Sequence, residues 1–184
     1  MSQLIALIIA IALGAIVTAI GYVFLGDAFT SNSERGVALQ LVNQASQVEM
    51  AMTGYRAENA GSAWTVNSPG GSDSVADFST VMTTTDTGLV PAGFMKDVPV
   101  APTATGYGFE ADGNDVYLTL RADDAELSDN VCLEIRELAG EDVSGGMPTD
   151  LTASATSDLV TELGTKRYNC FTDGTNNIFV YNVE

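Results

Sequence analysis

The sequence predicts an α+β fold: a long N-terminal helix, apolar and then amphipathic, packed on an antiparallel sheet of about four strands with a disulfide-closed C-terminal region. Three observations lead there. Residues 1–26 carry no side chain that is charged at neutral pH, residues 27–58 continue a helical pattern without proline, and the chain beyond residue 106 alternates strand-like segments with turns. We therefore expect an apolar helix at 1–26, an amphipathic helix at 27–58 and a globular head at 59–184. Within the head, a connecting loop covers 59–105, and the sheet with its C-terminal region covers 106–184.

The amino-acid composition argues against some functional classes, nucleic-acid-binding proteins above all. The 184 residues include 24 acidic and 7 basic side chains and no histidine, for a formal net charge of −17. So acidic a surface repels phosphate backbones, and we predict no direct nucleic-acid binding. The lack of histidine removes the commonest general base and metal ligand.

The first 26 residues have the length and polarity of a membrane-spanning helix. Leu4 to Leu25 is 22 residues, which is about 33 Å of helix and matches the hydrocarbon core of a bilayer. A secretory signal peptide is disfavoured, because there is no basic segment and the apolar run is too long. We expect that a charged leader has been removed and that Met1 is a processed terminus, although an initiator Met has the same appearance.

The helical pattern continues past residue 26 as one apolar stripe. Its members recur every three or four residues, and they are Val37, Leu41, Ala45, Val48, Met52 and Tyr55. Asn59, Ala60 and Gly61 mark the expected end of the helix. One continuous helix of up to about 57 residues, roughly 85 Å long, is the simplest interpretation, with the head packed on the stripe.

The head is expected to begin with a loop and a hairpin. Residues 61–105 are rich in Gly, Ser, Thr and Pro and predict a long loop with one short helix near 75–84. Tyr107 and Phe109 lie in a short strand, the sequence Asp112–Asp115 has turn chemistry, and residues 116–120 form the return strand.

A helix, a second short helix and a second hairpin complete the head. Asp124 or Ser128 is placed to cap a helix whose apolar stripe is Leu127, Val131, Ile135 and Leu138. Residues 158–163 predict another short helix, and residues 167–171 and 178–181 predict two strands around an Asp173–Gly174 turn.

The chain has two cysteines, Cys132 and Cys170, separated by 38 positions. If the head lies outside a membrane, a disulfide between them is the natural interpretation, worth roughly 4 kcal/mol by loop-closure arithmetic. Two cysteines without histidine make a metal site improbable on chemical grounds, and a free reactive pair is the remaining alternative.

Acidic side chains gather in two places, Asp112 with Asp115 and the segment 123–129. Paired carboxylates serve glycoside hydrolysis or calcium binding, but neither group has the spacing of a calcium-binding loop. A phosphate-binding loop, a nucleophile elbow and a Cys/His couple are all lacking from the sequence. We predict no enzymatic activity, no metal site and no cofactor, and we interpret both groups as solvated surface.

These features together resemble the type IV pilin family. The apolar start runs into a helix with the sequence Asn43–Glu49 and Tyr55–Asn59, and a loop, an antiparallel sheet and a cysteine-bounded C-terminal region follow. The segment Val116–Leu120, followed by a helix carrying Cys132, is similar to the larger type IVb pilins. The resemblance covers the whole architecture, and its sequence-specific part lies at about residues 1–60 and 115–135.

The resemblance implies a structural subunit of an extracellular type IV pilus, made as a major pilin. Such proteins are cleaved and N-methylated at the mature N-terminus, here Met1, by a prepilin peptidase. They are held in the inner membrane and then moved by the pilus assembly machinery into a helical homopolymer on the cell surface. The heads form the filament surface, used in adhesion, aggregation, conjugation or motility, and the Cys132–Cys170 region shapes it. The helix that would pack in the core carries Leu4, Ile5, Leu7, Ile8, Ile11, Gly14, Ile16, Ile20, Gly21, Val23 and Phe24.

One position of this chain departs from the sequence pattern of type IV pilins, and other functional classes remain as alternatives. Pilins of this family usually carry Glu at the fifth mature position, where this chain has Ile5. The resemblance also implies that the glycine-weakened segment from Gly14 would correspond to a stretch that unwinds in assembled filaments. The alternatives are a pseudopilin of a secretion system, an archaeal pilin-like subunit and a membrane-anchored binding or sensor module.

Overall fold

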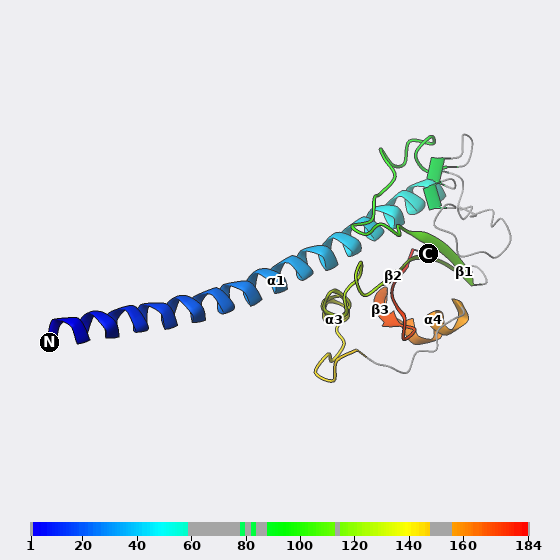
Figure 1. Ribbon diagram of the computed structural model, residues 1–184. Helices are drawn as coiled ribbons and strands as arrows, with labels where there is room; N and C mark the ends of the chain where they lie inside the picture. The colour runs from blue at the N-terminus through cyan, green and yellow to red at the C-terminus, as the bar shows by residue number, and fades with distance from the viewer. Residues whose placement is uncertain are drawn as a thin grey trace.

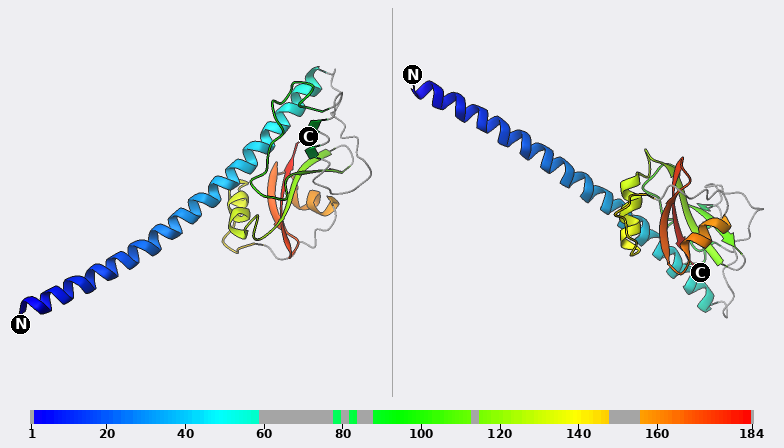
Figure 2. Two further views of the ribbon diagram at one scale, coloured as in Figure 1. Left: turned by 45° about the horizontal axis from the view of Figure 1, so that its top comes forward. Right: turned by 90° about the horizontal axis from the view of Figure 1, so that it is seen from below.

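A computed structural model gives the fold (Figure 1). It describes the backbone of residues 2–58, 78–79, 82–83, 88–112, 115–147 and 156–183. Within these ranges, the side chains of residues 2–12, 16, 19–28, 111, 112, 115 and 156–159 are not among the described ones. One helix enters the head along a single side and extends far beyond it, with the N-terminus at its free end (Figures 1 and 2).

Helix α1 spans Ser2–Glu58, 57 residues without a break. The predicted length is therefore confirmed, and the described helix ends just before the predicted stop signal, whose residues 59–61 lie outside the described part of the chain. The backbone remains helical at all three glycines of the apolar half. At Gly14 the carbonyl also accepts a hydrogen bond of 2.8 Å from the Thr18 hydroxyl.

The sheet has four antiparallel strands in the order β1-β2-β4-β3. Strands β1 (Gly108–Asp112) and β2 (Asp115–Asp123) form the predicted hairpin, in which Asp112 pairs with Asp115. Strands β3 (Tyr168–Thr172) and β4 (Asn176–Asn182) form the second hairpin. Because β4 pairs with β2 as well as β3, the C-terminal strand lies inside the sheet.

A hydrophobic core covers each face of the sheet, and the side chains of β4 contribute to both cores. Phe179 and Tyr181 face the larger core, which includes the buried side of α1. Ile178 and Val180 face a smaller core, which includes Leu163 of helix α4 (Thr156–Leu163). Successive side chains of a strand point to opposite faces, so a continuous apolar run fits a strand buried on both sides. Figure 2 shows α1 and α4 on opposite sides of the sheet.

Helix α3 (Asp129–Leu138) packs between α1 and strand β3. Its N-cap is Ser128, one of the two predicted capping residues, whose hydroxyl accepts a hydrogen bond of 3.3 Å from the amide of Val131. Val131, Cys132 and Ile135 are its buried residues, so most of the predicted apolar stripe is confirmed.

Differences from the sequence-based expectations are small and fall at element ends. Helix α4 begins at Thr156, two positions earlier than predicted, and strand β4 is longer at both ends than the predicted 178–181. Residues 78–79 and 82–83 are helical, which agrees with the short helix expected near 75–84, but its other residues lie outside the described part of the chain.

Candidate functional site

The second half of α1, residues 27–58, joins the projecting first half of the helix to the head. Leu41, Ala45, Val48 and Met52 of the predicted stripe are buried, and Val37 and Tyr55 are half-buried against them. Two further alanines, Ala38 and Ala51, are also buried and were missed, because alanine carries a weak hydrophobic signal.

Polar contacts also fasten the helix to the head. The Gln44 side chain donates to the carbonyl of Val100 at 2.9 Å and accepts from the Tyr107 hydroxyl at 2.5 Å. Burial raises the pKa of Tyr107, which keeps its hydroxyl a donor. Nearer the N-terminal end of this half-helix, the Asn130 side-chain amide donates to the Glu34 carboxylate at 2.9 Å. The head is thus attached from residue 34 onward.

The outward side of this half-helix carries no charged side chain between Gly36 and Met50. Leu39 is 42 % exposed and Met50 63 % exposed. The residues that share this side are Gly36, Leu39, Gln40, Asn43, Gln47 and Met50. In a chain with a net charge of −17, an uncharged and partly apolar helix face is unusual. It is suited to contact with another protein surface rather than to solvent alone.

The first half of α1 extends away from the head. Described side chains on it include Leu13, Val17 and, at its end, Phe29, which are 58, 69 and 78 % exposed. Of the predicted assembly residues, Gly14 is described and has open space around it. The side chains of Leu4, Ile5, Leu7, Ile8, Ile11, Ile16, Ile20, Gly21, Val23 and Phe24 lie outside the described residues, as does Met1. Within the part of the chain that the structure describes, no helix is both long enough and apolar enough to cross a membrane.

The predicted disulfide is confirmed. Cys132 of α3 and Cys170 of β3 are bonded, with their Cα atoms 5.2 Å apart. The guanidinium of Arg136 donates to the carbonyl of Cys170 at 3.2 Å, so the same helix and strand are joined twice. The disulfide anchors α3 to the sheet beside α1.

Next to the disulfide, Glu141 collects three nitrogen donors. Lys166 donates to its carboxylate, Asn169 donates at 3.2 Å, and Arg136 lies 3.9 Å away. The hydrogen bond from Lys166 is the main cause that holds the pKa of the Glu141 carboxyl below its usual value. Because each donor is already engaged, this cluster is a structural support of the C-terminal region rather than a reaction centre.

The acidic segment 123–129 shapes a turn. The Asp123 carboxylate accepts from the amides of Ala125 and Glu126 at 3.0 and 3.1 Å, and Asp124 accepts from the amide of Asp129 at 2.9 Å. The side chains of Asp112 and Asp115 lie outside the described residues. Among the residues that are described, no three metal-ligating side chains are grouped to hold an ion.

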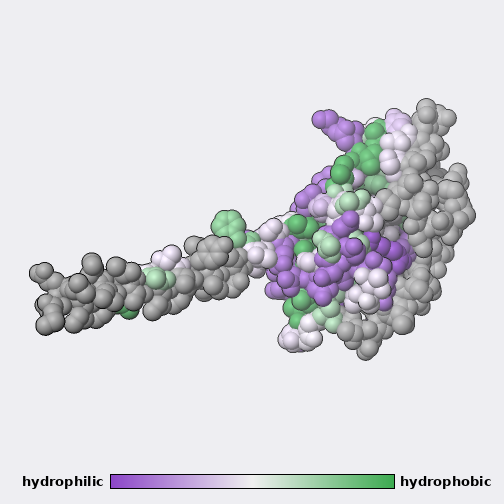
Figure 3. Space-filling model, viewed as in Figure 1, coloured by the Kyte–Doolittle hydropathy of each residue, from purple (hydrophilic) through white to green (hydrophobic). Residues whose placement is uncertain are grey.

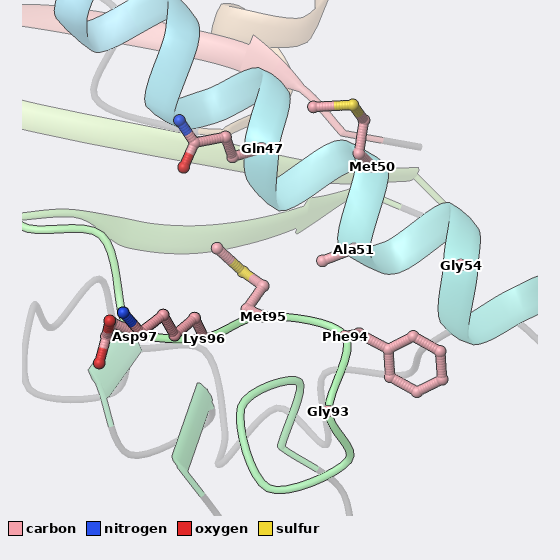
Figure 4. A pocket seen from close by; sticks show the side chains of 9 residues that line it. All are labelled: Gln47, Met50, Ala51, Gly54, Gly93, Phe94, Met95, Lys96 and Asp97. Carbon is pink, nitrogen blue, oxygen red and sulfur yellow. The ribbon is translucent and has the colours of Figure 1, made fainter.

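Two open grooves flank the second half of α1 at its opposite ends. One, of about 460 Å³, lies at the neck between α1 and α3, and we call it the neck groove. The other, of about 580 Å³, lies between α1 and residues 93–97, and we call it the loop pocket (Figure 4). Neither was predictable, because each is formed by segments far apart in the sequence.

Comparisons of the chain with protein-family models, with curated proteins and with solved structures find no match.

Proposed function

We propose that this protein is a structural subunit that polymerises through its N-terminal helix into an extracellular filament of the type IV pilus kind, most similar to a type IVb major pilin. The observation that carries the proposal is the division of one unbroken 57-residue helix. Its second half is packed on the head, whereas its first half projects beyond the head and has no side chain that is charged at neutral pH before Asp27.

In the proposed assembly, the apolar helix exchanges its lipid neighbours for identical helices of other subunits. An uncharged apolar helix is stable among lipid chains, and it keeps nearly the same apolar contacts when identical helices replace the lipid. The 24 acidic residues all follow residue 26, so none of them lies in the segment that exchanges lipid for neighbouring helices. On the side shown in Figure 3, hydrophilic residues cover much of the head, as expected of a filament surface.

The uncharged side of the second half-helix supports the same proposal. Leu39 and Met50 place exposed apolar side chains on this side of the helix, among polar but uncharged neighbours. A subunit whose helices gather in a central bundle is suited by such an uncharged face. A simple membrane anchor does not need one, because its juxtamembrane helix is surrounded by water.

The proposed life cycle follows from this assignment. The chain is processed and N-methylated at Met1 by a prepilin peptidase, resides in the inner membrane, and is then assembled by the pilus machinery into a homopolymer on the cell surface. The protein needs no cofactor and performs no catalysis in this role. The disulfide between Cys132 and Cys170 supports the head in the oxidising environment outside the cell.

Electron microscopy of material sheared from cells that produce the chain tests the proposal. Thin fibres that contain this chain, and that disappear when it is deleted, are the expected result. The membrane fraction of the same cells serves as a control for expression. Recovery of the chain only in membranes, with no fibre in the sheared material, would contradict the proposal and favour an anchored module.

A further inference from the structure

We propose that the neck groove of one copy docks on the Lys96 rim of the loop pocket of a second copy, forming a head-to-tail contact between subunits. This inference rests on the proposed function and adds the surface by which the heads pack. The two surfaces differ in charge, share apolar contacts and lie on opposite sides of α1.

The neck groove is acidic. Glu34 of α1 and Glu134 and Glu137 of α3 line it, together with the half-buried apolar residues Leu133 and Val143. Glu34 is held by the Asn130 amide. Within the described chain, no lysine or arginine forms an ion pair with any of these three carboxylates, and Arg35, the neighbouring cation on α1, is exposed.

The loop pocket offers a cation beside an apolar floor. Phe94 and Met95 provide the apolar part, and Lys96 and Asp97 lie at the end away from Phe94 (Figure 4). The close approach of the loop to the helix depends on Gly54, where an added Cβ would be 3.2 Å from the Phe94 ring. Lys96 and Asp97 are both exposed, so this rim is neutral overall on a strongly acidic molecule.

Lys96 stands apart from the other cations of the head. The ion pairs among the described residues are Arg121–Glu110, Arg136–Glu141, Lys166–Glu141 and Arg167–Glu49. Each of these four cations is used within its own subunit. Lys96 is therefore the basic side chain of the head that is left to meet a carboxylate of another copy, and an acidic groove is its complementary surface.

The placement of the two surfaces suits a repeating contact. Glu34 and Gly54 are 20 positions apart on α1, which corresponds to about 30 Å along the axis and about 200° around it. The surfaces therefore face nearly opposite directions at different heights. A second copy that is shifted along the axis, with its helix nearly parallel, presents its neck groove to the loop pocket of the first. Such a heterologous contact leaves both outer surfaces free to repeat, which generates an open helical polymer.

Zero-length carbodiimide coupling of sheared filaments tests the contact directly. The sequence has two lysines, Lys96 and Lys166, and Lys166 is already paired with Glu141. We expect mass spectrometry to find an intermolecular amide between Lys96 and Glu134 or Glu137. Filaments of the matched variant Lys96→Arg keep the charge but lack the reactive amine, so they should form normally and lose this cross-link.

Charge-reversal variants provide a second test of the contact between the two surfaces. Lys96→Glu should lower the yield of sheared filaments about tenfold, because it adds a carboxylate to the acidic groove of the neighbour. The double variant Lys96→Glu with Glu134→Lys should recover filaments. Equal amounts of each variant in the membrane fraction show that the subunit itself is stable.

The outcomes separate the two proposals. If the wild-type chain forms no filament, the proposed function fails and the contact falls with it. If the wild-type filament forms but Lys96 couples to no neck-groove carboxylate, or if Lys96→Glu assembles at the wild-type yield, the contact is wrong and the proposed function stands.

Discussion

The hydroxyl of Tyr181, on the last strand, donates to the carboxylate of Glu49 on α1 at 2.7 Å, across 132 positions of sequence. The other oxygen of the same carboxylate pairs with Arg167 at 3.1 Å. Both oxygens of Glu49 are therefore held by the C-terminal part of the head. Burial, together with the hydrogen bond to Glu49, raises the pKa of Tyr181 to about 12, so the hydroxyl stays a donor at neutral pH. These contacts fix the orientation of helix α1 relative to the sheet.

Tyr181→Phe removes one side of this contact while keeping the ring. We expect a loss of about 1.5 kcal/mol in the free energy of unfolding, because the lost hydrogen bond has a charged acceptor. Denaturant unfolding of the full chain in detergent, followed by near-ultraviolet circular dichroism, measures it. Glu58→Gln is the control, because Glu58 is exposed on the same helix and its substitution should change stability by less than about 0.5 kcal/mol.

The Glu141 cluster predicts a loss of stability in acid. The pKa of this carboxyl is lower in the folded chain than its usual value of 4.5, mainly through the hydrogen bond from Lys166. A lowered pKa means that the unfolded chain takes up the proton first as the pH falls. The stabilising contribution is therefore complete above pH 4.5 and is lost as the pH drops through the folded value.

Unfolding of the wild type and of Glu141→Gln should be compared between pH 7 and pH 3. We expect the wild type to be the more stable at neutral pH and the difference to shrink below pH 4.5. In a Lys166→Gln background, the same comparison should show a weaker dependence on pH. A difference that stays constant over the whole range would exclude this role of the ion pair.

The disulfide predicts sensitivity to reduction. Closing a loop between positions 38 apart is worth about 4 kcal/mol in the unfolded chain. Reduction, or the variant Cys132→Ala with Cys170→Ala, should lower the free energy of unfolding by this order. Thermal unfolding with and without reductant measures it, and the double variant should show no response to reductant. An unchanged transition in the wild type would mean that α3 is held by packing alone.

Local patterns predicted most of the fold because the deciding interactions are local. The capping hydroxyl of Ser128, the pairing of Asp112 with Asp115 and the apolar stripe from Val37 to Tyr55 all depend on residues a few positions apart. The disulfide was predictable because the sequence has two cysteines in all.

Long-range placement was not predictable in this way. Strand β4 has the continuous apolar run of a strand buried on both faces, but its pairing with β2 depends on packing of the whole head. For the same reason, nothing in the sequence near Glu49 indicates Tyr181 as its partner. The neck groove depends on α3 lying beside α1, which is fixed by the Cys132–Cys170 bond and the contact between Asn130 and Glu34.

Gly14 offers a test of the apolar half of the helix. An added Cβ meets nothing within 4 Å there, and the same holds for Gly36 in the second half. In the free subunit, Gly14→Ala and Gly36→Ala should each stabilise the helix by up to about 1 kcal/mol. If the segment from Gly14 unwinds on assembly, Gly14→Ala should lower filament yield, because it makes the helix harder to open, whereas Gly36→Ala should not.

Helicity in detergent and the yield of sheared filaments measure the two effects for both variants. Equal filament yields for Gly14→Ala and Gly36→Ala would mean that the apolar half stays helical in the polymer. A lower yield for Gly36→Ala alone would place the close helix contact at the head instead.

Val17 and Val100 provide a matched pair for the role of the projecting helix. Both are exposed valines, at 69 and 77 %, but Val17 lies on the first half of α1 and Val100 on the head. If residues 1–26 reside in lipid before assembly, Val17→Asp adds about 3 kcal/mol to the cost of insertion. We expect alkaline extraction to release Val17→Asp from membranes and to leave the wild type and Val100→Asp in the pellet. Retention of all three proteins in the pellet would show that a single charge does not oppose insertion at this position, and equal release of all three would remove the lipid stage from the proposed life cycle.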